Sequence, residues 1–349
     1  MFRVVIVLWG YNMRSINLAI IGATGLVGEA VIKLLADRKF PVGELFVLAS
    51  ENGAGAKVSF AGKSLTVKKA EDFDFSQVEV ALFAAGATVS QQLAPRAAEA
   101  GAVAVDLSPA FRYESDVPLL VAGVNDELLA QARENNLVAC ADAATVQLVR
   151  ALKPLADLAP LQEVVVTQFQ AASATGKSGV DQLAQQSVRL LNGLSPSEAA
   201  QAQIAFNVLP VSGQLQENGF TSEELKLMLE SRRILADQPL SVQVTTVRVP
   251  VFYGHGQSVS VRSIQGLACG QAMMAWDGQD DLDVQETDDP QAMSPVASVE
   301  GEPRLQISRI REDMEGSGGL SYFSVADNVR WGAALNAVKI AEKLLKDYL

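Results

Sequence analysis

The stretch Ile16–Gly28, INLAIIGATGLVG, decides the fold of this chain. Its first six residues, Ile16–Ile21, are a short apolar run that is typical of a buried parallel strand. Three glycines follow in GATGLVG, and an apolar stripe with helical spacing overlaps them. This order of strand, glycine-rich turn and helix is what a dinucleotide-binding fingerprint requires, because the backbone there can approach a pyrophosphate.

The rest of the first half repeats the alternation of strand and helix. Strand-like runs end at Ala49 and cover Val80–Ala84 and Ala102–Val105, with helical patterns between them. The alternation predicts an α/β fold with a Rossmann-type, doubly wound parallel sheet and right-handed crossovers. We expect residues 13–142 to form a dinucleotide-binding domain, although three glycines alone would also suit a tight turn in any such sheet. The expected cofactor contacts are Gly22, Thr24, Gly25, Leu26, Val27, Gly28 and Ser50.

The segment that follows the second strand bears on the choice of cofactor. It reads Ser50-Glu51-Asn52-Gly53 and contains no arginine. An acid at this place can accept the ribose hydroxyls of NAD, whereas an arginine would suit the 2′-phosphate of NADP. Glu51 is explained equally well as an exposed loop acid. The expected cofactor is NADP or NAD, with a weak or lost preference for NADP.

The second half predicts an α+β domain for substrate binding and dimerisation, residues 143–330. Longer strands are expected over Val164–Ala172, Val242–Val251 and Gln257–Val261, and helices over Val180–Leu191 and Ser222–Leu235. The apolar strands favour a homodimer built on this sheet, because a large sheet needs cover on its outer face. Residues 331–349 should form a C-terminal helix that packs back on the first domain, with an amphipathic pattern over Ala333–Leu349.

Composition excludes several classes of function. The 349 residues suit two domains, and their net charge of −12 disfavours both nucleic acid and anionic membrane surfaces as partners. The two cysteines, Cys140 and Cys269, make no disulfide framework and fit a reduced cytoplasm. A single histidine and the lack of ligand clusters at zinc spacing predict no metal site. The apolar run at residues 4–9 is too short to span a membrane, and residues 1–12 are expected to be an extension.

Two local motifs suggest other functions and are rejected. Gly176-Lys177-Ser178 resembles the end of a phosphate-binding P-loop, but Ala171 stands where that motif needs a glycine. The acidic stretch Asp277–Asp289 lacks the alternating ligands and central glycine of a calcium loop, so a solvated loop is expected there.

Several longer motifs together resemble the aspartate-semialdehyde dehydrogenase family. Asp106–Arg112, DLSPAFR, resembles the family's DNSSAFR, and Gln168–Gly179, QFQAASATGKSG, resembles its TYQAVSGAGKAG. FNVLP, ENGFTSEELK, RVPVFYGH and DNVRWGAALNA also have counterparts in the expected order. The resemblance runs from about Ser15 to the C-terminus. It implies NAD(P)-dependent aldehyde chemistry in amino-acid biosynthesis.

The resemblance also implies a substrate site, whose residue types suit the chemistry. The Glu-x-x-Lys spacing places both side chains on one helix face, an arginine fork matches a carboxylate, and histidine exchanges protons near neutral pH. Taken singly, each could be a surface pair, a helix salt bridge or a loop residue. The resemblance implies that Arg112 binds the phosphate, Gln170 orients the acyl intermediate and Arg248 clamps the substrate carboxylate. It implies that Glu223 and Lys226 hold the substrate amino group and the phosphate, and that His255 is the general acid/base.

The resemblance fails at the nucleophile. The family's turn NPNCST aligns so that Cys140–Ala144 lies over N-P-N-C-S, which places Ala143 at the position of the cysteine. A thiolate must add to the aldehyde and carry the acyl group as a thioester, and alanine can do neither. Cys140 lies three residues upstream, a shift of up to about 10 Å in an extended chain, which exceeds what reaction geometry tolerates.

Other family positions have changed as well. Leu107 replaces an asparagine, Gly123 a glutamate and Trp331 a lysine, and Asn52-Gly53 replaces Arg-Ser in the cofactor loop. The pattern resembles the Usg-type paralogues, which share the scaffold but lack the cysteine. We therefore expect a catalytically impaired family member with an NAD(P)-binding scaffold and a pocket for a small carboxylate or phosphate. The alternative is an active aldehyde or acyl-phosphate oxidoreductase that uses Cys140 or no covalent step.

Overall fold

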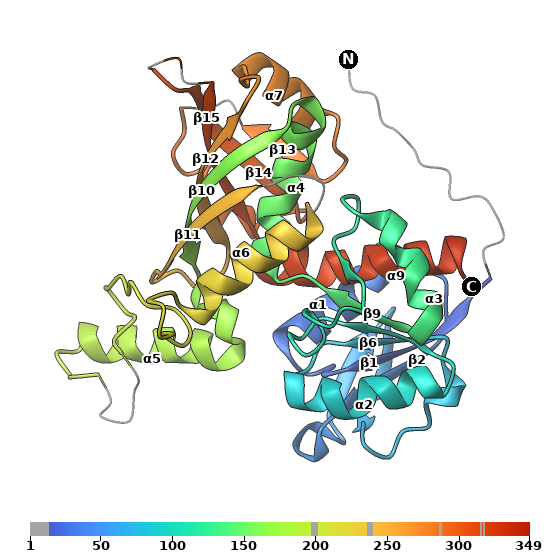
Figure 1. The fold of residues 1–349 in the computed structure, drawn as a ribbon. Coiled ribbons are helices and arrows are strands. Elements are labelled where there is room, and N and C mark those ends of the chain that lie inside the picture. Colours follow the sequence, from blue (N-terminus) through green and yellow to red (C-terminus); the bar gives the residue numbers. More distant parts are fainter. Residues whose placement is uncertain (1–13, 197–201, 236–239, 286–287, 315, 317) are drawn as a thin grey trace.

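The computed structural model describes residues 14–196, 202–235, 240–285, 288–314, 316 and 318–349. The expected extension, residues 1–12, lies outside them. Two large sheets dominate the described part, and Figure 1 shows the first in the lower and the second in the upper part of the molecule, with α9 (Asn336–Asp347) near their junction. No helix of the described ranges is long and apolar enough to cross a membrane.

The first sheet is parallel throughout and confirms the predicted doubly wound fold. Its order, β5-β2-β1-β6-β7-β9-β8, reverses direction between β1 and β6. Right-handed crossovers therefore place α1 and α2 on opposite faces of the sheet. The strands are β1 (Ile16–Ile21), β2 (Val42–Ala49), β5 (Lys68–Lys69), β6 (Val80–Phe83), β7 (Val103–Asp106), β8 (Leu119–Leu120) and β9 (Leu137–Cys140), and β3 (Lys57–Phe60) pairs with β4 (Lys63–Thr66) in a separate hairpin.

Glycines let α1 begin directly against the end of β1. Gly22 has a φ of +88°, and a Cβ there would lie 2.4 Å from the carbonyl oxygen of Ala84. A Cβ on Gly28 would lie 2.1 Å from the carbonyl oxygen of Gly22. These two glycines thus permit the close approach of helix and strand that the fingerprint requires. The helices and 3₁₀ turns of this half are α1 (Leu26–Asp37), η1 (Glu51–Gly53), η2 (Phe75–Gln77), α2 (Ala87–Glu99), η3 (Asp126–Gln131) and α3 (Ala132–Asn135).

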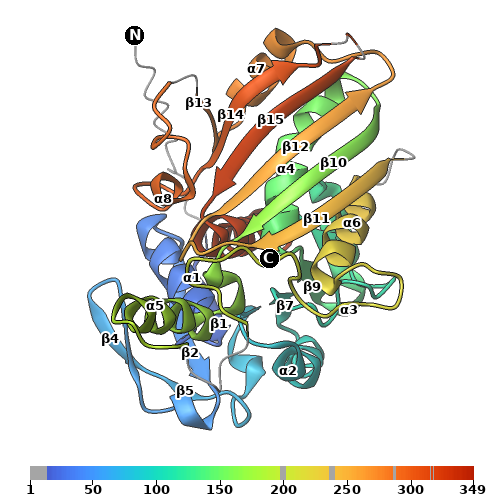
Figure 2. The ribbon, with the colours of Figure 1, turned by 90° about the vertical axis from the view of Figure 1, so that its left-hand side faces the viewer.

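The second sheet is mixed, in the order β11-β10-β12-β15-β14-β13. Figure 2 shows α4, α6 and α7 behind this sheet. The opposite face carries partly exposed side chains, among them Val165 at 42% exposure. The strands are β10 (Leu161–Gln170), β11 (Ser241–Arg248), β12 (His255–Ser263), β13 (Leu282–Gln285), β14 (Leu305–Glu312) and β15 (Gly319–Ala326), and the helices are α4 (Ala143–Leu158), η4 (Ala172–Thr175), α5 (Lys177–Leu191), α6 (Ser222–Ile234), α7 (Cys269–Asp277) and α8 (Pro295–Ser298).

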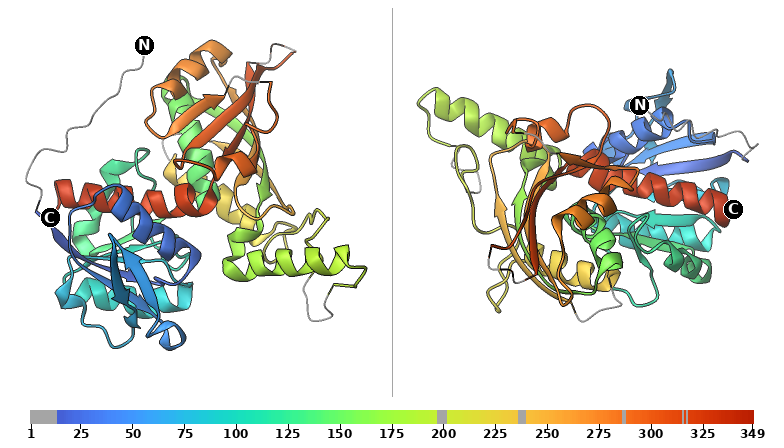
Figure 3. Two further views of the ribbon diagram at one scale, coloured as in Figure 1. Left: turned by 180° about the vertical axis from the view of Figure 1, so that it is seen from behind. Right: turned by 90° about the horizontal axis from the view of Figure 1, so that it is seen from above.

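The C-terminal segment returns to the first sheet. A π-helical segment, η5 (Asn328–Leu335), leads into α9 (Asn336–Asp347), and Figure 3 shows α9 from two further directions beside the first sheet. α9 contacts α1 and β7. The guanidinium of Arg38, the C-cap of α1, donates to both carboxylate oxygens of Glu342 on α9, at 2.7 and 2.8 Å.

Some predicted element ends were wrong. The strand expected over Val242–Val251 ends at Arg248, before Pro250, which has no N–H to donate to a ladder. The last residue expected in the strand Val164–Ala172 belongs to the 3₁₀ turn η4. The helix expected over Ala333–Leu349 begins inside η5 and ends at Asp347.

The solvated loop expected over Asp277–Asp289 was also wrong. The short strand β13 lies inside it, and the side chain of Asp281 is only 12% exposed. Asp281 pairs with Arg150 on α4 and, at 2.8 Å, with Lys339 on α9. This acid therefore joins elements from distant parts of the chain.

The close packing at the glycine turn gives a stability prediction. We expect Gly28→Ala to lower the free energy of unfolding by about 1–3 kcal/mol, because the new methyl overlaps the Gly22 carbonyl. The matched control is Gly270→Ala in α7, where a Cβ meets no atom within 4 Å. Better helix propensity should make that variant neutral or stabler by up to about 1 kcal/mol. Urea titrations of both variants measure the difference, and equal effects would contradict the packing argument.

Candidate active site

A pocket of about 250 Å³ brings together residues from both sheets. Its walls come from the ends of β9, β10 and β11, the beginnings of α4 and β12, and helix α6. Every residue predicted for catalysis or substrate binding lines it. These are Arg112, Ala143, Gln170, Glu223, Lys226, Arg248 and His255.

Ala143 is the first residue of α4 and lines this pocket. The helix begins here because the carboxylate of Asp142 accepts a hydrogen bond from the backbone N–H of Ala144, at 3.0 Å. The backbone of Gly332 in η5 packs against the methyl group. A Cβ at Gly332 would lie 2.8 Å from that of Ala143.

His255 is the first residue of β12, so the alternative of a loop histidine is wrong. It is 2% exposed, and its Nδ1 accepts the backbone N–H of Ala171 at 3.2 Å. Nδ1 is thereby an acceptor, which assigns the proton of the neutral ring to Nε2. Burial lowers the pKa of His255 to about 4. The ring is therefore neutral at pH 7 and offers one N–H donor.

Two cations of the pocket already have carboxylate partners. Arg112 lies 3.0 Å from Glu230 and 3.4 Å from Asp142, and Lys226 lies 3.0 Å from Asp142 and 2.8 Å from Glu223. Burial by itself raises the pKa of Asp142, but the charges of Lys226 and Arg112 outweigh it and hold that pKa well below its usual range. Asp142 is thus ionised and shared between the two cations.

Arg248 has neutral partners instead. Its Nη2 lies 3.4 Å from Oε1 of Gln170 and 3.4 Å from the hydroxyl of Ser212, and its Nε is buried with no partner. No carboxylate of the described residues pairs with it. Gln170 is held in place because Ser212 donates to its Oε1 and its own Nε2 donates to Glu223 at 2.8 Å.

Neither cysteine stands where the missing nucleophile would. Cys140 ends β9 and is 2% exposed, and burial raises the pKa of its thiol. Cys269 begins α7 and does not line the pocket. A buried thiol with a raised pKa is a poor nucleophile because it is the thiolate that reacts.

Sequence reasoning missed several polar residues of the site. Glu230 pairs with Arg112, and its Oε2 accepts the backbone N–H of Asp142 at 2.8 Å. Its spacing was a usable signal, since Glu223, Lys226 and Glu230 follow one helix face at i, i+3 and i+7. Asn328 of η5 accepts the backbone N–H of Gly254, the residue before β12, at 3.1 Å. No spacing in the sequence indicated its role.

The predicted cofactor residues lie at the carboxyl ends of β1 and β2. Gly22–Gly28 joins β1 to α1, and Ser50 precedes the 3₁₀ turn η1. Lys177, from the rejected P-loop motif, reaches this turn and donates to the carbonyl of Thr24 at 2.7 Å. Glu51 is exposed, 4.0 Å from Lys69. No cluster that could hold a metal ion occurs in the ranges that the structure describes.

Comparisons with known proteins agree with this geometry. Residues 17–132 match the family model "Semialdehyde dehydrogenase, NAD binding domain", and residues 152–331 match "Semialdehyde dehydrogenase, dimerisation domain". Aspartate-semialdehyde dehydrogenase 2 of Vibrio cholerae is 42% identical over 337 residues, which cover 96% of this chain and 99% of that protein. The chain belongs to the aspartate-semialdehyde dehydrogenase family.

Solved structures of this family have the same fold. The crystal structure of aspartate semialdehyde dehydrogenase II complexed with ASA, from Vibrio cholerae, superposes with a TM-score of 0.93 at 42% identity and covers 96% of this chain and 100% of that one. The Candida albicans aspartate semialdehyde dehydrogenase with NADP shares the fold at 21% identity and a TM-score of 0.72, over 95% of this chain and 98% of that one. The resemblance inferred from the motifs is thus confirmed at the level of the family.

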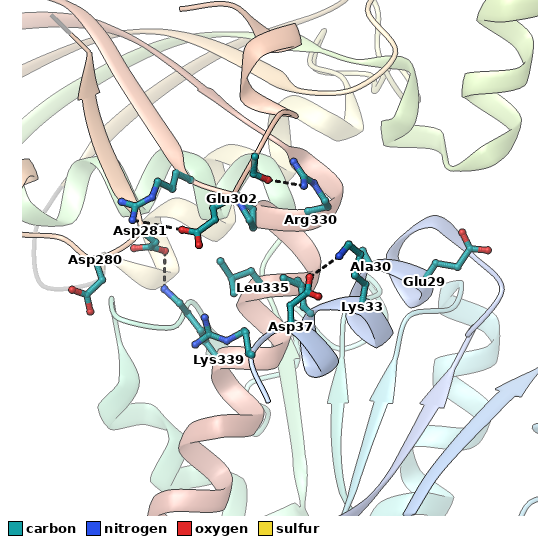
Figure 4. A pocket seen from close by; sticks show the side chains of 15 residues that line it. Glu29, Ala30, Lys33, Asp37, Asp280, Asp281, Glu302, Arg330, Leu335 and Lys339 are labelled. Atoms are coloured by element: carbon teal, nitrogen blue, oxygen red, sulfur yellow. Dashed lines mark hydrogen bonds and ion pairs between the residues drawn. The ribbon is translucent and has the colours of Figure 1, made fainter. Parts of the chain in front are cut away.

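A larger cleft of about 840 Å³ shares no lining residue with this pocket. It lies between α1, η5, α9 and the segments that precede β13 and β14 (Figure 4). Each of its cations has a carboxylate partner within the chain. The pairs are Lys33–Asp37, Arg38–Glu342, Arg304–Asp283, Arg330–Asp327 and Lys339–Asp281.

The buried histidine gives a pH prediction. Between pH 6.5 and about 4 the unfolded chain binds a proton at His255 that the folded chain refuses, so stability falls as the pH falls through this window. Compared with His255→Asn, whose Oδ1 can still accept from Ala171, the unmodified protein should lose up to about 3 kcal/mol by pH 4. Urea unfolding of both proteins from pH 7.5 to 4 measures this. Parallel stability profiles would show that the fold does not lower the pKa of His255.

Proposed function

We propose that this chain is a ligand-binding, NAD(P)-binding member of the aspartate-semialdehyde dehydrogenase family with impaired catalysis, similar to the Usg-type paralogues. One observation carries the proposal. The pocket keeps Gln170, Arg248 and His255, but the residue that begins α4 beside them is Ala143. Without a thiolate no thioester can form. When catalytic residues act together, removal of the nucleophile lowers the rate by several orders of magnitude.

The roles of the domains follow from the same arrangement. We assign nucleotide binding to residues 13–142, substrate binding and dimerisation to residues 143–330, and the C-terminal helix to residues 331–349. The match of residues 152–331 to a dimerisation domain supports a homodimer. The partly exposed face of the second sheet, opposite α4, α6 and α7, is the surface we propose for it.

Within the pocket the remaining residues keep binding roles. Arg248 receives a carboxylate, Gln170 and His255 supply neutral hydrogen-bonding groups, and Glu223 faces the pocket beside Lys226. A nucleotide would lie with its pyrophosphate at Gly22–Gly28, where α1 begins with no side-chain cap on its N–H groups. In catalytically active relatives, this nucleotide would be the group that accepts or supplies the hydride. This chain's own residues bind and orient the ligand.

The missing nucleophile can be restored as a test. We expect no phosphate-dependent NAD(P)H production from aspartate semialdehyde above trace level in the unmodified protein. Ala143→Cys should be alkylated by iodoacetamide at least tenfold faster than the native cysteines, because position 143 is partly exposed in the pocket, whereas Cys140 at the pocket wall is 2% exposed and burial raises the pKa of its thiol. Ala143→Ser is the control, since it adds a similar side chain without a thiol.

Two results would contradict this proposal. Turnover by the unmodified protein that Cys140→Ser abolishes would make Cys140 the nucleophile and support the active oxidoreductase. A folded Ala143→Cys protein that iodoacetamide does not label would show that position 143 does not correspond to the family's cysteine.

The cofactor loop gives a second prediction. Asn52 is exposed in η1, and the four residues Ser50–Gly53 offer no cation to a 2′-phosphate. NAD and NADP should therefore bind with dissociation constants within about threefold of each other. Asn52→Arg should favour NADP by about tenfold or more, as expected for a charge-assisted hydrogen bond, whereas Asn52→Ala should not. Calorimetric titration measures both ratios, and a strong NADP preference in the unmodified protein would indicate another cation, such as Lys69 or Lys57.

A further inference from the structure

We propose that Asp142 is a specificity-determining residue that serves as the pocket's own anion. Its carboxylate fills the place between Arg112 and Lys226, so that the pocket excludes phosphate and acyl phosphates. A small carboxylate compound that carries no second negative charge binds through Arg248 instead. This inference rests on the proposed role of the pocket in ligand binding and names the class of ligand.

The contacts of Asp142 show that the position is full. Its Oδ2 lies 3.0 Å from the Lys226 ammonium and 3.4 Å from Arg112, while Oδ1 accepts the N–H of Ala144 at the start of α4. An ammonium, a guanidinium and a helix N-terminus are the three kinds of group that bind phosphate in proteins. All three are directed at one side chain of the chain itself.

Two further carboxylates balance the charges of Arg112 and Lys226. Arg112 also has Glu230 at 3.0 Å, and Lys226 also has Glu223 at 2.8 Å. A phosphate that entered here would have to displace a buried carboxylate from its partners or lie beside it. Like charges in a pocket of low dielectric repel strongly, so both arrangements are unfavourable.

Arg248 remains the pocket cation without a carboxylate in the described part of the chain. Its neighbours, Gln170 and Ser212, are neutral, and its Nε has no partner. One guanidinium fork matches one carboxylate and balances its single charge. The rest of such a ligand would meet Ala143 and the neutral ring of His255, neither of which stabilises a second negative charge.

The neighbouring sequence sharpens the argument. In the alignment with the turn NPNCST, Asp142 stands at an asparagine and Ala143 at the cysteine. Asparagine is neutral but caps a helix as well as aspartate does. Asp142→Asn therefore removes the charge while it keeps the cap of α4.

The test measures inorganic phosphate binding by calorimetry at pH 7. The unmodified protein should bind phosphate at least tenfold more weakly than Asp142→Asn. Asp74→Asn is the matched control, because Asp74 caps η2 at an exposed site and lines no part of the pocket. It should behave like the unmodified protein.

In the unmodified protein, L-2-aminobutyrate should bind more tightly than phosphate, and Arg248→Met should abolish that binding.

Phosphate binding by the unmodified protein at the affinity of Asp142→Asn would overturn the proposal. So would binding of neither phosphate nor L-2-aminobutyrate, since Arg248 would then receive no anion. The comparison of the two ligands needs only the unmodified protein, so it stands even if Asp142→Asn fails to fold. Nucleotide titration is separate: a protein that binds L-2-aminobutyrate but no NAD or NADP would contradict the proposed function and leave this inference intact.

Discussion

The burial of helix α4 against the second sheet, η5, α6 and α7 is the constraint on which the site depends. Its residues from Ala144 to Leu152 are all buried, and it contacts η5, α6, α7, β10 and β15. The Trp276 indole on α7 donates to the carbonyl of Ala151 at 2.8 Å, which ties the helix to the second half. A helix packed on all sides cannot shift or turn without breaking a core. Its first turn is therefore held where the residues of both halves meet.

The polar cluster at this turn is held together by mutual neutralisation. Glu230 is fully buried, and burial raises the pKa of its carboxyl, yet Arg112 and the N–H of Asp142 both donate to it. Buried ion pairs of this kind contribute little net stability, but the loss of one partner leaves an uncompensated charge and costs about 3–5 kcal/mol. The cluster thus acts as one unit. A change at any member alters the pKa and position of the others.

The sequence was sufficient for the first sheet and for those residues of the pocket that belong to recognisable motifs. The glycine turn, the alternating strands and the ordered motifs located them because each has a local pattern. The sequence was insufficient where contacts between distant segments determine whether a charged side chain is buried. Asp281 appeared to belong to a solvated loop, and only the return of α9 shows that Lys339 and Arg150 bury it. Asp142 was visible as a residue of the turn, but its two cations come from segments 30 and 84 positions away.

The presence of Asp142 and the absence of a thiol at position 143 are chemically consistent. A thiolate at the start of α4 would lie next to an ionised carboxylate, and a neighbouring negative charge raises the pKa of a thiol. The same carboxylate takes up the two cations that could otherwise stabilise a negatively charged nucleophile or a phosphate. An aspartate at 142 thus disfavours the thiolate form at 143 without blocking access to that position, and alanine there removes the conflict. Arg248 is unaffected by this exchange, because its partners are the neutral Gln170 and Ser212. Under the proposed function, a pocket altered in this way loses the means to form an acyl intermediate while it keeps the means to bind a carboxylate.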